Sequence, residues 1–297
     1  MLWPALRPGY GPLPCTCVPF SSSYPLTALI SSPPAPCPTP SYLVLLGGLS
    51  DSSLPTPYAL PLANMCEDQG WHFANPSLRS SALQFGFGSL DNDAEDLAHF
   101  LSYLAAATPS PATPSPRIVL VGHSTGCQQI AHLLRTRPGA ADCVVGAVLQ
   151  AGVSDRETSE DYAKHLEAAR AMIAKGAGDE FMPRAAFWAP ITAARFEALF
   201  GDVGEGDSYF CSDMEPGVMR ERLAGLRGLE FGLYAYSMED EYVPPGVDRG
   251  GAIGKVCEAG GMEALKLEGA NHNLSRPEDG SAGRRLVEAI REKLEAL

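Results

Sequence analysis

Residues 117–127 read RIVLVGHSTGC and place a serine between two glycines directly after an apolar run. Gly122-x-Ser124-x-Gly126 at a strand-to-helix junction is typical of a nucleophile elbow, a turn so tight that only glycine fits two positions from the serine. The helix that follows directs its first N–H groups at the same point, so Thr125 N–H is an expected oxyanion donor. The spacing predicts Ser124 as a nucleophile for acyl transfer, and a purely structural turn is the alternative.

A serine hydroxyl needs a base, and in this arrangement the chain order is serine, acid, histidine. Beyond the helix that the elbow opens, His165 and His272 are the histidines that follow Ser124 in the sequence. His165 falls in a segment expected to be a solvated helix. His272 falls between the last expected strand and the last expected helix, so we predict that it is the base. The side chain of His123, inside the elbow, is expected to point away from the mouth of the site.

Three consecutive acids, Glu239, Asp240 and Glu241, follow an expected strand and are followed by a Val-Pro pair. Asp240 is the predicted third member of a catalytic triad, because a carboxylate there would hold the imidazole tautomer and stabilise the imidazolium. Glu239 and Glu241 are expected to be solvated neighbours. Asp155 is the alternative acid.

A second oxyanion donor should come from an earlier strand-to-helix loop, and the glycines of Gly47-Gly48-Leu49 would let the backbone approach a substrate. Leu49 N–H is the first candidate and Gly48 N–H the second, with a plain glycine turn as the alternative. Gly251 to Lys255 lacks the phosphate-binding pattern, and the eight cysteines have no zinc spacing. Acyl transfer through a triad needs no cofactor or metal, so we expect none.

The elements that would position these residues alternate in type along the chain. Strands are expected at 42–46, 118–121, 144–149, 229–236 and 263–267, and helices at 91–104, 125–137 and 283–297. Short apolar runs separated by amphipathic helices are the pattern of a parallel sheet that helices cover on both faces. The fold class expected is therefore α/β, in the form of an α/β-hydrolase with a mostly parallel central sheet.

Composition divides the chain into four parts. Residues 1–40 hold eleven prolines and one charge, and are expected to form irregular coil or short edge strands. Residues 41–155 and 226–297 carry the alternating pattern of the core. Residues 156–225 interrupt it with a mainly helical insertion that is expected to cap the site as a lid.

Charge and hydropathy exclude several classes of partner. A net charge of −13 would repel nucleic acid. No apolar run approaches the roughly 20 residues that span a bilayer, and the N-terminus lacks the pattern of a signal peptide. Scattered cysteines fit reduced thiols, so a cytoplasmic protein that acts on a small molecule is expected. The oligomeric state does not follow from the sequence.

The chain resembles the fungal fusarinine C esterase family of siderophore-hydrolysing serine hydrolases. The resemblance runs from about Tyr42 to the C-terminus and rests on six stretches: 47–51 (GGLSD), 86–91 (GFGSLD), 122–128 (GHSTGCQ), 150–156 (QAGVSDR), 207–213 (DSYFCSD) and 240–244 (DEYVP). It implies an α/β-hydrolase fold with an inserted lid, and hydrolysis of ester bonds in hydroxamate siderophores. Ser124, Asp240 and His272 match the family's triad positions. The first 40 residues do not resemble the start of the family's chains.

The sequence thus predicts a serine esterase that works through an acyl-enzyme. Two alternatives stay open at this point. Another acyl hydrolase, such as a carboxylesterase, thioesterase or lactonase, would use the same residues on a different acyl compound. A non-catalytic binding protein on the hydrolase fold would keep the architecture without turnover.

Overall fold

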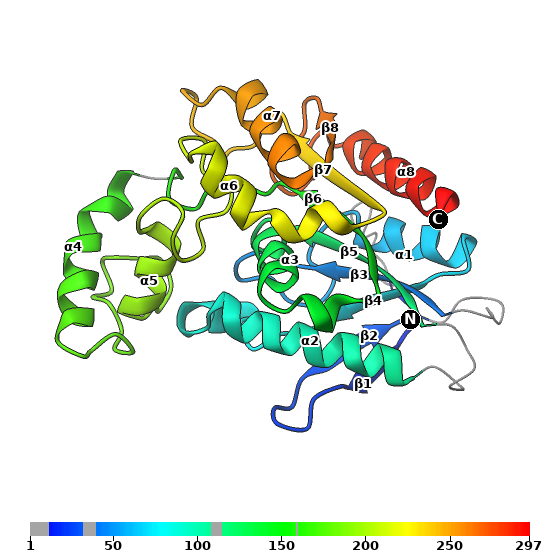
Figure 1. Cartoon of the computed structure of the whole chain (residues 1–297), viewed down its shortest axis with the longest axis horizontal. Coiled ribbons are helices and arrows are strands. Elements are labelled where there is room, and N and C mark those ends of the chain that lie inside the picture. Colours follow the sequence, from blue (N-terminus) through cyan, green and yellow to red (C-terminus); the bar gives the residue numbers. More distant parts are fainter. Residues whose placement is uncertain (1–11, 32–39, 108–114, 159) are drawn as a thin grey trace.

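A computed structural model describes residues 12–31, 40–107, 115–158 and 160–297. The stretch 108–116, rich in proline, serine and threonine and expected from its composition to be a loop, lies mostly outside these residues. One eight-stranded sheet runs through the molecule (Figure 1). Its strands are β1 (Thr16–Pro19), β2 (Thr27–Ile30), β3 (Ser41–Leu46), β4 (His72–Pro76), β5 (Arg117–His123), β6 (Val144–Gln150), β7 (Phe231–Ser237) and β8 (Glu263–Leu267).

The strand order is β1-β2-β4-β3-β5-β6-β7-β8, and every pairing from β4 to β8 is parallel. Only β1 and β2, in the proline-rich segment, pair antiparallel, at one edge of the sheet. Prolines are tolerated at such an edge because fewer ladder hydrogen bonds are needed there. The expected fold class is confirmed, and the open question of coil or edge strands in the first 40 residues is answered by two short strands.

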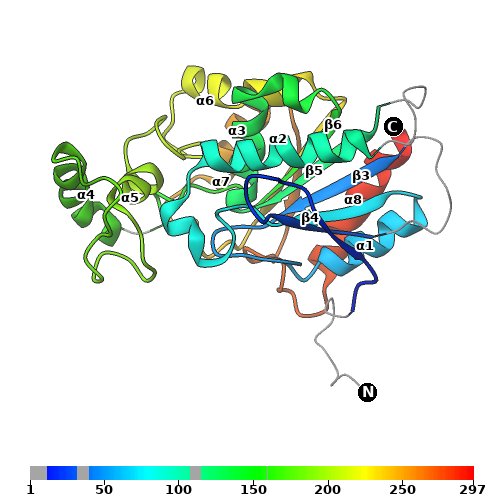
Figure 2. The ribbon, with the colours of Figure 1, turned by 90° about the horizontal axis from the view of Figure 1, so that it is seen from below.

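The helices are α1 (Ala59–Asp68), α2 (Leu90–Ala106), α3 (Thr125–Thr136), α4 (Glu160–Ala174), α5 (Ala193–Phe200), α6 (Pro216–Arg222), α7 (Arg249–Gly260) and α8 (Ser281–Ala296), with 3-10 turns η1 (Ala82–Phe87), η2 (Pro138–Ala141) and η3 (Ala224–Gly228). Alternate residues of β3 pack on opposite faces: Val44 joins a cluster with α2, α3, α6 and α7, whereas Leu43 and Leu45 join one with α1 and α8. Successive side chains of a strand point to opposite faces of the sheet, and helices cover both faces here, so every residue of β3 is buried and most are apolar. The three layers are visible in Figure 2.

Between β6 and β7 the chain leaves the sheet, and α4 and α5 project to one side of it (Figure 1). We call α4, α5 and the chain that joins them (160–200) the cap. Its apolar side chains form a cluster of their own, which includes Phe187, Phe196 and Phe200 and takes in Phe85 of η1. In contrast, α6 contacts α7 and α3 of the main body. Within the described residues, no helix is long and apolar enough to cross a membrane.

Candidate active site

Ser124 lies at the junction of β5 and α3 in a strained conformation, with φ 53° and ψ −121°. Such angles are sparsely populated for a residue with a side chain, and they are typical of a residue that its surroundings hold in place. Its N–H donates to Gln150 O at 3.0 Å, which ties the turn to the neighbouring strand. A Cβ on Gly122 would lie 2.5 Å from the backbone of Gly126, and one on Gly126 would lie 2.8 Å from Leu46 O. The glycine spacing is therefore a steric requirement of this turn.

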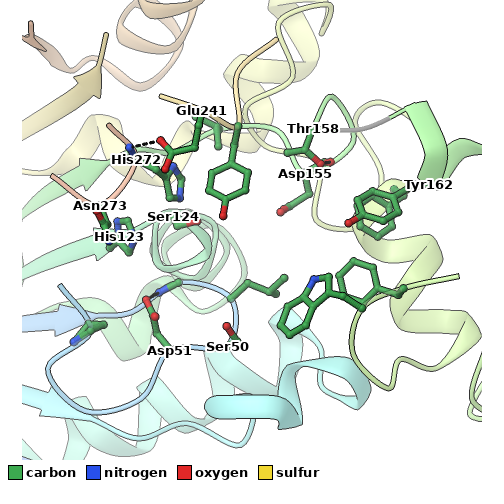
Figure 3. A pocket seen from close by; sticks show the side chains of 18 residues that line it. Ser50, Asp51, His123, Ser124, Asp155, Thr158, Tyr162, Glu241, His272 and Asn273 are labelled. Atoms are coloured by element: carbon green, nitrogen blue, oxygen red, sulfur yellow. Dashed lines mark hydrogen bonds between the residues drawn. The ribbon is translucent and has the colours of Figure 1, made fainter. Parts of the chain in front are cut away.

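His272 and Asp240 meet beside Ser124, although they lie on different loops. His272 Nδ1 is 2.7 Å from Asp240 Oδ2, and both side chains are buried. The second oxygen of Asp240 accepts the N–H of Tyr242 at 2.9 Å. An ionised carboxylate only accepts hydrogen bonds, so Nδ1 carries the proton and Nε2 keeps a lone pair. In Figure 3 the His272 ring points toward Ser124.

The backbone of His272 is held by two further side chains. Glu241 Oε2 accepts the His272 N–H at 2.8 Å. Burial opposes the charge of Glu241, but hydrogen bonds from backbone N–H groups, that of His272 first, bring its pKa below the ordinary value. Glu241 is exposed, as expected of a solvated neighbour, but it also holds the backbone of His272. Its partner lies 31 positions away in the sequence, so no local pattern could have indicated this contact.

Gln150, fully buried at the end of β6, holds the other side of His272. Its Nε2 donates to His272 O at 2.9 Å and to Ser237 Oγ at 3.2 Å. Its Oε1 is 2.9 Å from Tyr58 Oη and 2.7 Å from His123 Nδ1. A backbone carbonyl can only accept, so the amide orientation is fixed, and both Tyr58 and His123 must donate to Oε1. All four hydrogen-bonding positions of this amide are used.

His123 lies against the base, and its buried ring is bonded to Gln150. The two imidazole rings are 5.0 Å apart between centroids, and His123 lines the same cavity as Ser124 and His272. Burial and the neighbouring His272 lower the pKa of His123 to about 3. The ring is therefore neutral at ordinary pH and adds no second positive charge when His272 is protonated.

The loop after β3 approaches Ser124 from the opposite side. A Cβ on Gly48 would lie 2.8 Å from Ser124 Cβ and 3.3 Å from its Oγ. Gly48 N–H donates to Asp51 Oδ2 at 2.8 Å, so of the two predicted oxyanion donors in this loop Gly48 is already engaged. Leu49 N–H has no hydrogen-bond partner among the described residues. Burial raises the pKa of Asp51, whereas the Gly48 bond and His272 oppose that rise.

Ser124, His123 and His272 line one cavity of about 340 Å³. Five aromatic side chains also line it: Tyr162, Phe187, Trp188, Phe200 and Tyr242. Three acids, Asp51, Asp155 and Glu241, also line it, and the lining among the described residues holds no lysine or arginine. Figure 3 shows these acids around the same space as Ser124. The cavity therefore combines apolar walls with negative charge.

Asp155, the alternative acid, is bound elsewhere. Its Oδ2 accepts Gln128 Nε2 at 2.7 Å, and no described contact joins it to the His272 ring. Burial raises its pKa to about 6, and the hydrogen bond from Gln128 works in the opposite direction. Gln128 Nε2 also lies 2.9 Å from Asp207 O, and Asp207 forms a buried ion pair with Arg195 of α5. Asp155 thus belongs to a polar network between the cap and α3.

The chain has an α/β-hydrolase fold, with a serine on the sharp turn after β5 and a hydrogen-bonded histidine–aspartate pair at the same end of the sheet. It belongs to the family described as "Protein of unknown function (DUF1749)", whose model matches residues 30–295. The same residues contain all of the site described above.

Two sequences and one solved structure illustrate these similarities. UPF0613 protein PB24D3.06c of Schizosaccharomyces pombe is 27% identical over 256 residues, 80% of this chain and 78% of that one. Fusarinine C esterase sidJ of Aspergillus fumigatus is 32% identical over 157 residues, 47% of this chain and 42% of that one. Siderophore hydrolase EstB from Aspergillus fumigatus superposes with a TM-score of 0.79 at 23% identity and covers 99% of both chains. The resemblance to the fusarinine C esterase family is thereby confirmed.

A metal site has no support in the part of the chain that the structure describes. No three histidine, cysteine, aspartate or glutamate side chains there are grouped in a way that could hold an ion. The chemistry available to this site is that of a hydroxyl, an imidazole and carboxylates.

Proposed function

We propose that the chain is a serine hydrolase that cleaves carboxylic esters, with Ser124 as nucleophile, His272 as base and Asp240 as the acid that orients it. The observation that carries this proposal is the Nδ1–Oδ2 hydrogen bond, which leaves His272 Nε2 free on the side that faces the strained serine. An imidazole in that tautomer can accept a hydroxyl proton.

The reaction proceeds in two steps. Ser124 Oγ attacks the ester carbonyl while its proton passes to His272 Nε2, and the carbonyl oxygen takes up negative charge opposite the N–H groups of Thr125 and Leu49. The intermediate collapses, and His272 donates the proton to the leaving alkoxide. Water then attacks the acyl-enzyme with the same base, and the carboxylic acid and free serine are released.

Ser124→Ala tests this assignment. We expect the variant to lose at least a thousandfold in the rate of p-nitrophenyl acetate hydrolysis and all labelling by a fluorophosphonate, with an unchanged thermal midpoint. Ser102→Ala, an exposed serine on α2, is the matched control and should behave as the wild type. Undiminished turnover by Ser124→Ala would refute the mechanism. A wild type that neither turns over nor labels would support a binding protein instead.

We further propose that the natural esters are those of hydroxamate siderophores of the fusarinine type. The printed names of two similar fungal proteins, fusarinine C esterase and siderophore hydrolase, support this substrate class. The three acids around the cavity favour a substrate that carries protonated amines. Mass spectrometry after incubation with iron-free and ferric siderophore would show the hydrolysed fragments. Turnover of simple esters or thioesters without any siderophore cleavage would favour another acyl hydrolase.

We also propose that the insertion at 156–225 acts as a lid that shapes the substrate cavity. Four of the five aromatic side chains in the cavity wall, Tyr162, Phe187, Trp188 and Phe200, come from the cap. Substitutions in the cap should therefore change which ester is preferred more than they change the rate with the smallest ester.

A further inference from the structure

The large apolar side chains that remain exposed are concentrated on one part of the surface. Seven such side chains occur in the described residues. Four of them, Leu83, Phe87, Phe181 and Trp188, are 52–57% exposed, and they belong to η1 and to the chain between α4 and α5. We call these four residues the apolar rim. Single exposed apolar residues are ordinary, but four on two neighbouring segments indicate a binding surface.

The two segments of the rim are fixed to each other by backbone and ring contacts. Thr192 N–H donates to Gly86 O at 2.8 Å, and Thr192 also pairs with Phe181 in an isolated antiparallel bridge. The rings of Phe87 and Phe181 meet edge to face at 6.1 Å. These contacts hold η1 and the cap against each other and join Phe87 to Phe181.

The rim is continuous with the cavity that holds Ser124. Trp188 belongs to both, because it is half exposed and also lines the cavity with Ser124 and His272. On its inner side Trp188 packs on Phe85 at 5.5 Å and on Phe187 at 5.4 Å. An apolar group that leaves the cavity past Trp188 can therefore pack on the exposed part of this indole ring.

We propose that the apolar rim binds an apolar portion of the ester substrate that is too long for the cavity, such as an acyl chain of about eight to twelve carbons. This inference rests on the proposed ester hydrolysis and adds a substrate class to it. A cavity of about 340 Å³ is at the small end for a ligand site, so a long hydrocarbon chain would extend past its aromatic side chains. The rim would extend the apolar contact beyond the mouth.

Two other occupants fit the rim less well. The chain carries a net charge of −13, and the rim loop 181–188 holds a single basic residue, Arg184, so an anionic lipid surface would be repelled. A second copy or another protein seated on the rim would cover Trp188 and obstruct the mouth of the cavity that the reaction needs. The substrate itself is the occupant that uses both surfaces at once.

The test is a series of p-nitrophenyl esters from acetate to dodecanoate, each below its micellar concentration. We expect wild-type kcat/KM to rise at least tenfold from acetate to decanoate, mostly through KM. Phe87→Ser and Phe181→Ser should each lose about five- to tenfold on decanoate and less than twofold on acetate. Val218→Ser, which removes an exposed apolar residue of α6, is the matched control and should leave the profile unchanged.

The other outcomes show whether the apolar rim or the proposed ester hydrolysis is at fault. A flat chain-length profile, or one that the two phenylalanine variants leave unchanged while acetate is still hydrolysed, overturns the apolar rim. If no ester is hydrolysed and Ser124 does not label, the proposed function fails. The rim is then tested by tryptophan fluorescence of Ser124→Ala titrated with methyl decanoate, where a saturable change that Phe181→Ser weakens and methyl acetate does not produce supports it.

Two further measurements guard against a different occupant. Sedimentation that shows a dimer, or co-sedimentation with phosphatidylcholine vesicles, each abolished by Phe181→Ser, would overturn the inference. The rim would then belong to a second copy of the chain or to a membrane surface.

Discussion

Gln150→Leu is the substitution that most directly tests how the base is positioned. The amide of Gln150 satisfies four buried groups: Tyr58 Oη, His123 Nδ1, Ser237 Oγ and the carbonyl of His272. Each buried polar group left without a partner costs about 1–3 kcal/mol. The hydroxyls can rotate to other partners and leucine restores packing, so we expect a net loss of about 3–5 kcal/mol in the free energy of unfolding.

The same change should affect catalysis beyond its effect on stability. His272 O loses its only described side-chain partner, and a base displaced by about 1 Å can cost roughly a hundredfold in rate. We therefore expect kcat to fall about 100-fold at a temperature at which the variant remains folded. Urea unfolding and p-nitrophenyl acetate turnover measure the two effects separately. Gln69→Leu is the matched control, because Gln69 is only partly buried and its side chain makes one surface hydrogen bond, with Glu295.

Gln150→Glu isolates the donor half of the amide. A carboxyl keeps the shape and the acceptor oxygen, but when ionised it sets a negative oxygen against His272 O. Burial disfavours that charge, so the variant should be closer to wild-type stability at pH 5 than at pH 8. If the free energy of unfolding of Gln150→Leu is within 1 kcal/mol of the wild-type value, the hydrogen-bond network does not stabilise the fold. If it loses stability but keeps full kcat, Gln150 does not position the base.

Two further predictions concern Ser124's neighbour and a buried acid. Gly48→Ala should lower kcat/KM roughly 10- to 100-fold with little change in thermal midpoint, because the new Cβ would lie 2.8 Å from Ser124 Cβ. Gly254→Ala, where a Cβ meets nothing within 4 Å, is the control, and equal activity of both variants would contradict the close approach. Burial raises the pKa of Asp93 to about 6 from 3.8, so the folded state binds the proton more tightly and the wild type loses stability as pH rises between these values. In urea unfolding, Asp93→Asn should therefore be more stable than the wild type by about 1–2 kcal/mol at pH 8, and no more stable than it at pH 4. Equal stability at pH 8 would show that the buried Asp93 carboxylate is compensated by its neighbours.

The local patterns of the sequence were sufficient for the scaffold. Uniform apolar runs predicted the central strands β3, β5 and β6, and each was found within a few residues of its expected bounds. Glycine spacing around Ser124 predicted a turn that the structure shows to be sterically closed to any Cβ. These features are readable because backbone conformation and strand burial depend on neighbours a few positions away.

Long-range contacts around the base were beyond the reach of the sequence. Gln150 contacts residues 27 to 122 positions away, and they meet because β5, β6 and β7 end side by side at one edge of the sheet. The same arrangement brings the ring of His123 against that of His272. It also places Glu241 where its carboxylate accepts the backbone N–H of His272. Which residues form a long-range hydrogen bond depends on the order of strands and loops in space. The sequence around each residue does not indicate that order.

The α/β layers and the turn that carries Ser124 could thus be predicted from the sequence alone, because both follow from short-range sterics and the burial of alternating side chains. It also indicated the order in which serine, acid and histidine occur along the chain. The groups that hold His272 could be identified only in the folded protein. The same is true of the exposed apolar rim beside the cavity. Those features depend on segments far apart in the chain packing together, and only the folded protein brings them into contact.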